Sequence, residues 1–429
     1  MTGLGSLVRI QYCPRRVRWN YKNFEIQISH LLPTQIPDLC TMISKPFGPR
    51  IGIVGGGQLG KMLIEAGLPW NVNYNVLDPG VDAPAARYAA EFIHGSLTDR
   101  EAILKLAEVS DILTYEIEHI DVETLIELEG QGKTVIPGPR ILKTIQDKSL
   151  QKQFYSQNEL STTPFTLFHT IDEMRGAASD FSDEKIVVKS AKGGYDGKGV
   201  WILNRSDVQQ GNVPFELNGN TFFLEQFLGH ARELSVIVAR NTDGDSKTYP
   251  SVEMVFDPEL NLVDYLFAPA NVTDEEETAL RTLAHDAIDA LEGVGLFAVE
   301  MFLTDEGEVF INEIAPRPHN SGHQTIEGNV TSQYEQLNRI LLGLPLGETD
   351  LYSPVVMINL LGDQGVSGDY GLSGLDQFFA AKDAHLHWYN KSQTRPGRKM
   401  GHITVRASSV HEAHTTATHI RSRLKMQQR

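Results

Sequence analysis

Short apolar runs alternate with longer amphipathic segments from Arg50 onward, and this alternation constrains the fold more than any other feature of the chain. Such a series is typical of βαβ units that build a parallel sheet. The Pro137-Gly138-Pro139 turn is expected to close this first, α/β unit. The predicted strands are 51–54, 75–77, 112–115 and 134–136, and the predicted helices are 59–66, 101–108 and 122–129.

Beyond a predicted helix over 143–158, the pattern changes to strands and hairpins, which indicates an α+β unit. A helix over 274–291 is expected to begin at Thr273, whose side chain can cap its first turn. A helix over 331–342 should end at Gly343, and a small mixed domain should follow. The predicted strands are 186–189, 200–203, 221–225, 233–239, 264–267, 296–303, 309–314, 355–360 and 386–388.

The chain of 429 residues has a formal net charge of −17, and no apolar run in it is long enough to span a bilayer. Nucleic acid and membranes are therefore not expected as partners, because clustered lysine and arginine drive binding to a phosphate backbone. A cytoplasmic location is expected. Both cysteines lie within residues 1–41, so a disulfide framework or thiolate metal site is excluded after that segment.

Residues 1–41 also differ in charge, with five basic and two acidic residues. An arginine-rich, acid-poor segment can be a transit peptide. This one lacks serine richness and a clean amphipathic period, so we favour a disordered extension, or an upstream segment that precedes a true start at Met42.

Gly55, Gly57 and Gly60 form a G-x-G-x-x-G loop between a predicted strand and helix, and Asp78 follows at the spacing of the dinucleotide fingerprint. An NAD-dependent oxidoreductase is one interpretation. The motif itself requires only a backbone turn that comes close to a phosphate or to a neighbouring element at a helix N-terminus. Nothing further along the chain supports hydride transfer, so the loop is expected to pack tightly or to touch a phosphate-bearing substrate.

A lysine and glycine cluster follows the strand that ends at Lys189. Backbone N–H groups of a glycine-rich hairpin can cradle phosphates while ammonium groups neutralise their charge, although glycines in hairpins are also ordinary turn residues. Lys148 could supply a further cation. The segment 225–228 has the form of an adenine hinge with an acid for the ribose hydroxyls. The candidates are Gly193, Gly194, Tyr195, Asp196, Gly197, Lys198 and Gly199 in the loop, and Glu225, Gln226, Phe227 and Leu228 in the hinge.

Glu300 and Glu313 fall on the two strands of a predicted hairpin, and Asn312 adjoins Glu313. Carboxylate and amide oxygens suit Mg²⁺ or Mn²⁺, and Mg²⁺ usually bridges to substrate phosphates rather than sitting in an all-protein cage. The hairpin therefore predicts a metal-bound ATP.

A cationic loop follows this hairpin directly. Arg317 is expected to bind an anion, and a histidine near neutral pKa could remove a proton from a substrate amine. The sequence leaves the choice between His319 and His323 open.

These motifs together resemble the ATP-grasp superfamily. Three strings resemble more closely the family of N5-carboxyaminoimidazole ribonucleotide synthetases: GGYDGKG at 193–199, NEIAPRPHNSGH at 312–323 and RPGRKMGH at 395–402. The resemblance runs from about Arg50 past His402 and leaves out residues 1–41. The family often has a histidine where this chain has Phe256, so a nucleotide contact at that position is in doubt.

The resemblance implies a pre-ATP-grasp Rossmann-like domain over 42–145, an ATP-grasp domain over 146–347 and a small C-terminal domain over 348–429. It implies that ATP, bicarbonate and 5-aminoimidazole ribonucleotide react through carboxyphosphate to give ADP, phosphate and the N5-carboxylated nucleotide. The sequence leaves open whether the amine meets carboxyphosphate itself or CO₂ released from it. It also implies a homodimer and a separate mutase that receives the product. Glu233 joins the ATP-binding candidates, and the candidates for substrate binding are Gln58, Glu116, Tyr195, Asp196, Asn320, Ser321, Lys391, Arg395, Arg398 and Lys399.

Three alternatives stay open at this point. Another ATP-grasp ligase, such as a formate-using glycinamide ribonucleotide transformylase or a biotin carboxylase, would share the ATP motifs. An oxidoreductase would bind a nicotinamide cofactor and show no ATPase activity. A non-catalytic sensor would bind ATP without turnover.

Overall fold

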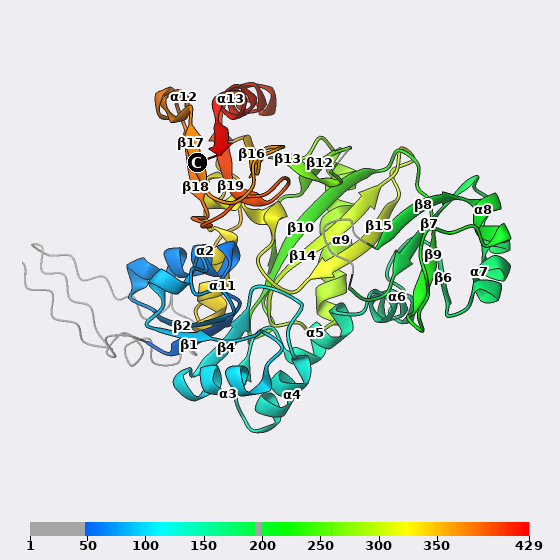
Figure 1. Cartoon of the computed structure of the whole chain (residues 1–429), viewed down its shortest axis with the longest axis horizontal. Coiled ribbons are helices and arrows are strands. Elements are labelled where there is room, and N and C mark those ends of the chain that lie inside the picture. Colours follow the sequence, from blue (N-terminus) through cyan, green and yellow to red (C-terminus); the bar gives the residue numbers. More distant parts are fainter. Residues whose placement is uncertain (1–47, 194–198, 259, 429) are drawn as a thin grey trace, which may run out of the picture. The chain divides into compact units, whose positions relative to one another are not determined.

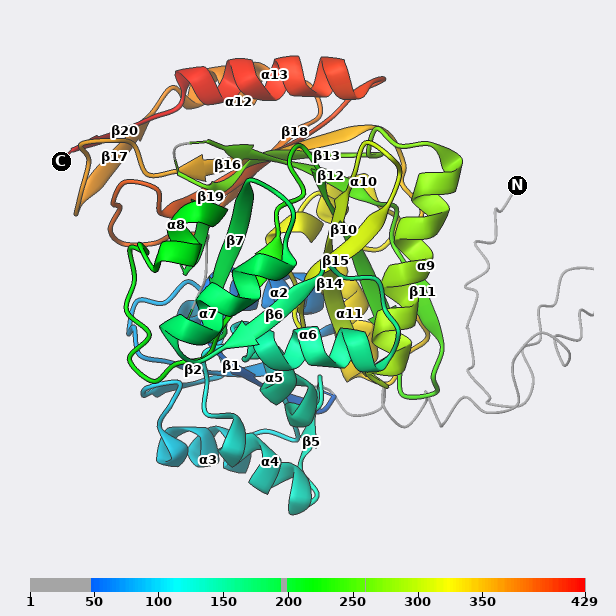
Figure 2. The ribbon, with the colours of Figure 1, turned by 90° about the vertical axis from the view of Figure 1, so that its right-hand side faces the viewer.

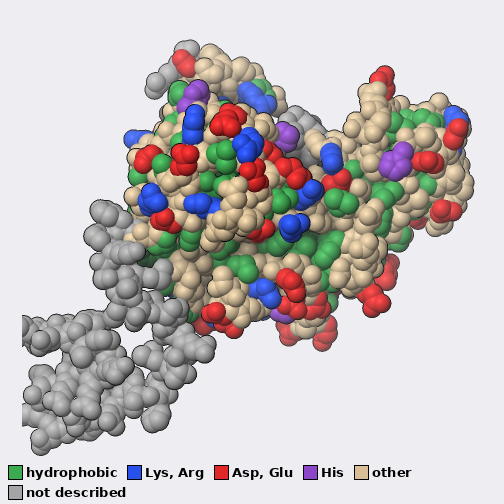
Figure 3. All heavy atoms as spheres, turned by 90° about the horizontal axis from the view of Figure 1, so that it is seen from below, with side chains coloured by type: hydrophobic (Ala, Val, Ile, Leu, Met, Phe, Trp, Pro, Cys, Tyr) green, Lys and Arg blue, Asp and Glu red, His purple; other side chains and the backbone are tan. Residues whose placement is uncertain are grey.

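The computed structural model describes residues 48–193, 199–258 and 260–428. The predicted extension over 1–41 and the loop residues Gly194, Tyr195, Asp196, Gly197 and Lys198 lie outside these ranges. From Pro49 onward the chain forms one unit. None of the helices in the described ranges has the length and apolar character that crossing a membrane requires. On the face shown in Figure 3, acidic and basic side chains are interspersed.

The N-terminal part of this unit is a parallel sheet with helices on both faces (Figure 1). Alternate residues of one strand serve opposite faces: Ile53 packs with α2, whereas Val54 packs with α3 and α4. Burial on both faces explains why the central strand is buried from Ile51 to Val54 and carries no polar side chain there. The strand order is β3 (Glu91–His94), β2 (Asn73–Asp78), β1 (Arg50–Val54), β4 (Ile112–Tyr115) and β5 (Thr134–Val135), and the helices are α2 (Gln58–Gly67), α3 (Arg100–Val109), α4 (Val122–Gly130) and α5 (Pro139–Ile145).

An antiparallel sheet follows, and α7 and α8 help to cover its apolar face. Its core contains Phe168, Ile186, Val188 and Leu224, which come from three of its strands. The order is β6 (Phe165–Phe168), β9 (Phe222–Gln226), β7 (Lys185–Ser190) and β8 (Val200–Asn204), with α7 (Ile171–Ala177) and α8 (Arg205–Gln210).

A third sheet joins the middle of the chain to its C-terminal part. The long helix α9 (Asp274–Ala290) covers β10 and β14, and α13 (Val410–Arg423) packs on β16 and β19 (Figures 1 and 2). The order is β15 (Val309–Ala315), β14 (Gly295–Leu303), β10 (Arg232–Arg240), β12 (Val252–Asp257), β13 (Leu262–Ala268), β16 (Val355–Leu361), β19 (Lys399–Arg406) and β18 (Ala384–Trp388), and β11 (Ser246–Thr248) pairs with β10.

Smaller elements complete the described chain. Helix α6 (Lys148–Gln157) contributes Tyr155 to the core under α9, and α11 (Gln333–Leu341) packs against α2. The remaining elements are α10 (Thr325–Gly328), α12 (Leu375–Ala380) and the antiparallel pair β17 (Tyr370–Ser373) and β20 (Lys425–Gln428).

The predicted single helix over 143–158 is instead two helices, α5 and α6, and this expectation was wrong. Asp147 begins α6, because its carboxylate accepts hydrogen bonds from the backbone N–H groups of Ser149 and Leu150 at 2.9 and 3.4 Å. The elements that the pattern did not predict are β3, β6, β11, β12, β17, β19, β20, α7, α8, α10, α12 and α13.

Candidate active site

The β14–β15 hairpin brings the predicted metal ligands together. Glu300 and Glu313 are directly opposed across the two strands, whereas the next pair is Met301 with Ile311, so Asn312 is an extra residue in β15. In regular strands, consecutive residues point to opposite faces, and a bulge of this kind re-aims a side chain. Both Asn312 and Glu313 can therefore face the lysines of the neighbouring elements.

Two lysines meet this strand pair. The ammonium group of Lys148 on α6 pairs with the Glu313 carboxylate, and Lys189 Nζ on β7 donates to Asn312 Oδ1 at 2.9 Å. The charge of Lys148 lowers the pKa of Glu313, against the opposite effect of burial. The pKa of Glu300 is raised to about 8 by burial and by the negative charge of Glu313. The two carboxylates therefore repel each other when both are ionised, and a bound cation would relieve that repulsion.

The hinge strand β9 places its acid differently from the expectation for a ribose contact. The Glu225 carboxylate is 2% exposed and lies between Lys152 and Lys189, with Lys189 Nζ at 2.5 Å. It is thus already engaged by two ammonium groups. Glu233, on β10, is only partly buried, and burial raises its pKa to about 7. The hinge residues Gln226, Phe227 and Leu228 are partly buried at the end of β9.

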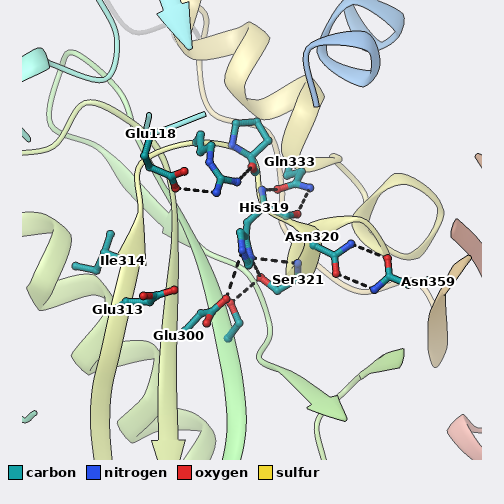
Figure 4. Close-up of polar contacts among 12 residues, drawn as sticks. Glu118, Glu300, Glu313, Ile314, His319, Asn320, Ser321, Gln333 and Asn359 are labelled. Atoms are coloured by element: carbon teal, nitrogen blue, oxygen red, sulfur yellow. Dashed lines mark hydrogen bonds and ion pairs between the residues drawn. The ribbon is translucent and has the colours of Figure 1, made fainter. Parts of the chain in front are cut away.

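The candidate active site, called the centre below, has the Glu300–Glu313 pair and its lysines on one side and residues 316–323 on the other. Figure 4 shows the Glu300 side chain directed at His319. His319 Nε2 lies 3.4 Å from Glu300 Oε1, and His319 Nδ1 lies 3.0 Å from Ser321 Oγ. Gln333 on α11 holds the backbone of the same histidine: its Nε2 donates to His319 O at 2.8 Å, and its Oε1 accepts from His319 N at 3.0 Å. His319 is thus fixed through both its ring and its backbone.

The two candidate histidines have different environments. The His319 side chain keeps 19% of its surface exposed, whereas His323 is 1% exposed and lies among aromatic rings, with its Nδ1 at 3.1 Å from Tyr334 OH. Burial lowers the pKa of both rings well below the ordinary value. The structure brings His319, and not His323, into contact with Glu300.

The remaining loop residues anchor the loop to other elements. Arg317 Nη2 pairs with Glu118 Oε1 at 2.7 Å, which links the loop to the end of β4. Asn320 and Asn359 exchange two amide hydrogen bonds of 3.0 Å each (Figure 4), and Ser321 Oγ lies 2.8 Å from Ser235 Oγ.

The glycine loop at the start of α2 already holds an anion, the carboxylate of Glu116. The backbone N–H groups of Gly57 and Gly60 donate to Glu116, and Gly56 N donates to Asp78 Oδ2 at 2.7 Å. A Cβ on residue 57 would come within 2.5 Å of Glu116 Oε1, so the close approach requires glycine. The carboxylates occupy the N–H groups that a dinucleotide pyrophosphate would need. Gln58, the other candidate from this loop, is partly buried at the first position of α2.

The four basic candidates for substrate binding, Lys391, Arg395, Arg398 and Lys399, lie at and before the start of β19. Lys391 Nζ donates to the backbone oxygen of Lys399 at 2.7 Å, and burial together with the nearby Arg398 lowers the pKa of Lys391 to about 8. Arg395 is exposed. Lys391 also lines a cavity of about 740 Å³, together with residues 81–83 and β17. His402, the last residue of the RPGRKMGH string, is fully buried inside β19 and does not belong to this surface.

Three side chains with a place in this centre were not among the sequence candidates: Lys152, Glu118 and Gln333. Lys152 follows Lys148 by four residues on a predicted helix, and this spacing, which puts both on one helix face, was an available signal. Glu118 and Gln333 act through contacts between segments far apart in the chain, and no local pattern marks them.

Comparison with known proteins identifies three matching family models. Residues 49–146 match the ribonucleotide synthetase preATP-grasp domain, residues 153–334 the ATP-grasp domain, and residues 355–416 the phosphoribosylaminoimidazole carboxylase C-terminal domain. The chain is 39% identical over 360 residues to N5-carboxyaminoimidazole ribonucleotide synthase of Bacillus subtilis, which covers 83% of this chain and 91% of that protein.

Solved structures agree. The N5-carboxyaminoimidazole ribonucleotide synthetase of Thermotoga maritima superposes with a TM-score of 0.80 at 41% identity, covering 89% of this chain and 100% of that one. The enzyme from Aspergillus clavatus, in complex with ADP and 5-aminoimidazole ribonucleotide, gives a TM-score of 0.78 at 31% identity, covering 87% and 99%.

Proposed function

Because the chain belongs to the N5-carboxyaminoimidazole ribonucleotide synthase family, we propose that its reaction centre lies between the Glu300–Glu313 pair and the loop 316–323. The chain is an ATP-dependent ligase that carboxylates 5-aminoimidazole ribonucleotide in purine biosynthesis. The observation that carries the placement is the position of the acidic pair, where Glu313 meets Lys148 and Glu300 meets His319. Phosphoryl transfer beside Lys148 and proton transfer at His319 can thus take place on opposite sides of the same pair of carboxylates.

ATP would lie against the lysines, and Mg²⁺ or Mn²⁺ would be held by Glu300, Asn312 and Glu313. The raised pKa of Glu300 supports this, since a divalent cation relieves the repulsion between two adjacent carboxylates. Within the described ranges no three His, Cys, Asp or Glu side chains converge as a cation site. Two carboxylates completed by phosphate oxygens are the usual arrangement for Mg²⁺. The ion would neutralise charge on the β- and γ-phosphates.

Lys148 and Lys189 would orient the triphosphate, and Glu233, rather than Glu225, would take the ribose hydroxyls. Glu225 is engaged by two lysines, whereas Glu233 keeps part of its surface exposed. Residues 193–199 would complete the phosphate site. A bicarbonate oxygen would then attack the γ-phosphorus while the bond to the ADP oxygen breaks, giving carboxyphosphate.

The amine of 5-aminoimidazole ribonucleotide would attack the carboxyl carbon of carboxyphosphate, and phosphate would leave. His319 would take the amine proton, because its ring contacts Glu300 and keeps part of its surface exposed. Arg317, fixed by Glu118, would offer its charge to bicarbonate. His323 would support the loop from the core.

The nucleotide phosphate would bind the basic cluster of Lys391, Arg395, Arg398 and Lys399, because guanidinium and ammonium groups complement phosphate. The cavity beside Lys391 supports this location. Gln58, Asn320 and Ser321 would lie on the side of the aminoimidazole. A homodimer, a separate mutase that accepts the product and a cytoplasmic location complete the proposal.

The test is phosphate release from ATP, measured with and without 5-aminoimidazole ribonucleotide and bicarbonate. We expect turnover only when both are present. The matched comparison replaces the nucleotide with glycinamide ribonucleotide. Stimulation by glycinamide ribonucleotide, or turnover without bicarbonate, would contradict the proposed chemistry.

A further inference from the structure

Lys152 is a buried charged side chain to which the chemistry above gives no role. It lies on α6, four residues after Lys148, and is 2% exposed. Its ammonium group pairs with the Glu225 carboxylate and donates to the hydroxyls of Thr162 and Thr163 at 2.6 and 2.8 Å. A buried lysine is costly unless it is paired and hydrogen-bonded, and here both conditions hold.

Glu225 is shared between two lysines. Its Oε1 faces Lys152, and its Oε2 lies 2.5 Å from Lys189 Nζ. Lys189 also donates to Asn312 Oδ1 at 2.9 Å. Lys152, Glu225 and Lys189 therefore form one continuous buried chain of contacts, with two positive groups around one negative group.

The ionisation of this chain is consistent with its geometry. Burial lowers the pKa of Lys152 to about 8, although the charge of Glu225 opposes the shift, so the lysine is charged at neutral pH. Burial would raise the pKa of Glu225, but its two lysines lower it to about 2. One carboxylate cannot offset two ammonium groups, so the three side chains together carry one net positive charge.

We propose that Lys152 is a positioning residue that acts on ATP through Lys189. Lys152 neutralises part of the negative charge of Glu225. Glu225 can therefore hold Lys189 in place without cancelling the positive charge that Lys189 offers to a phosphate. Without Lys152, Glu225 would pair with Lys189 alone and cancel its charge. This inference rests on the proposed role of Lys189 at the phosphates of ATP.

A second contact connects Lys152 to β15, the strand that carries the proposed metal ligands Asn312 and Glu313. Thr162, which accepts a hydrogen bond from Lys152, donates its own to Ile311 O at 2.8 Å. Ile311 immediately precedes Asn312 in β15. The same ammonium group is therefore connected to β9, through Glu225, and to β15, through Thr162.

Lys152→Met tests the role of the charge. We expect the KM for ATP in the complete reaction to rise about tenfold or more, because Glu225 would then neutralise Lys189, the lysine proposed to bind the phosphates. The change in kcat should be smaller than the change in KM. A direct titration with ATP, together with the unfolding temperature, separates weaker binding from loss of fold. Lys143→Met, which removes a lysine from a surface ion pair with Glu123, is the matched control and should leave KM unchanged.

The double variant Lys152→Met/Glu225→Gln distinguishes an effect of charge from an effect of packing. It also tests the inference if the single variant Lys152→Met does not fold. It removes one positive and one negative charge, and Lys189 keeps its own. We expect its KM for ATP to return to within about threefold of the wild-type value. Lys152→Arg, which keeps the charge, should stay equally close to wild type.

An unchanged KM for ATP in Lys152→Met, or a double variant that binds ATP about tenfold more weakly than wild type, would overturn the inference. Lys189→Met separates this failure from failure of the proposed function. If Lys189→Met leaves ATP binding intact, the role of Lys189 at the phosphates is wrong. If it weakens ATP binding while Lys152→Met does not, only the role of Lys152 fails.

Discussion

A single extra residue in β15 decides which side chains meet in the centre. Without the bulge, Asn312 and Glu313 would point to opposite faces of the hairpin, and only one of them could face the lysines. With it, Lys189 reaches Asn312 while Lys148 reaches Glu313. The neighbouring Ile311 and Ile314 remain buried under α9, so the bulge leaves the core intact.

Glu313→Gln tests the acidic pair at the level of one charge. The amide keeps the size of the side chain but removes the carboxylate that faces Lys148 and adjoins Glu300. We expect phosphate release to fall about a hundredfold or more, because stabilisation of charge in the transition state is lost. The unfolding temperature should stay close to that of wild type. Glu308→Gln, at the exposed turn of the same hairpin, is the control, and full activity in Glu313→Gln would remove the metal assignment.

Gly322→Ala tests how tightly the His319 loop is held. A Cβ at this position would lie 2.4 Å from Gln333 Oε1 and 3.0 Å from Gln333 Nε2, so Gln333 would have to move. Because Gln333 holds the backbone of His319, we expect kcat to fall about tenfold or more while ATP binding is retained. Gly176→Ala, where nothing lies within 4 Å of the added Cβ, is the control. Unchanged kcat in Gly322→Ala would show that the hydrogen bonds from Gln333 do not position His319.

Side-chain caps determine where several helices begin. Helices α3, α4 and α6 begin after Asp99, Asp121 and Asp147, and each aspartate accepts a hydrogen bond from a backbone N–H of the first turn. In α9 the cap is reciprocal, because Thr273 Oγ1 accepts from Glu276 N at 3.2 Å and Glu276 Oε2 accepts from Thr273 N at 2.7 Å.

Thr273→Ala is expected to lower the free energy of unfolding by about 1 kcal/mol, because the first turn of α9 loses its cap. Thr278→Ala is the matched control, since Thr278 Oγ1 bonds only to the Asp274 carbonyl within the helix, and alanine is the better helix former. Urea unfolding measures both. Equal losses in the two variants would show that the cap does not contribute.

Elements with strong local signals could be predicted from the sequence. Strand β4 lies at the predicted residues, and α9 begins at the predicted Thr273 cap. The predicted mixed fold class is confirmed by the matching family models. The elements that were missed lack such signals: β19 begins with the basic Lys399 and contains Gly401, so its strand character depends on pairing with β16 and β18.

The sequence indicated which side chains to consider for the centre, but it did not indicate which side chains would contact one another there. The spacing of Glu300, Asn312 and Glu313 indicated oxygen ligands, whereas the pairing of Glu225 with two lysines depends on contact between β9, β7 and α6. His319 and His323 could not be told apart by type. They are distinguished only because the turn Asn320–Gly322 directs one ring toward Glu300 and the other into the core beside Tyr334.

One sheet passes through the predicted domain boundary at residue 347, because it contains strands from both sides of that boundary. Strand β13 pairs with β16 in register from Tyr265 with Ile358 to Ala268 with Val355. Val252, Met254 and Leu266 share a core with Val355 and Met357. Asn359 on β16 also donates to Val263 O at 2.8 Å, beside its amide pair with Asn320. The C-terminal strands therefore support both the sheet and the His319 loop.

A chain that ends at residue 347 should consequently fail to fold as an independent unit. Its strand β13 would become an edge with unpaired backbone groups, and the apolar cluster around Leu266 would face water, which favours aggregation. We expect no cooperative thermal transition and no ATP binding. The control ends at residue 424 and loses only β20, which pairs with β17, so it should keep the transition. A soluble shorter chain that unfolds at the temperature of the full protein would show instead that residue 347 divides two autonomous domains.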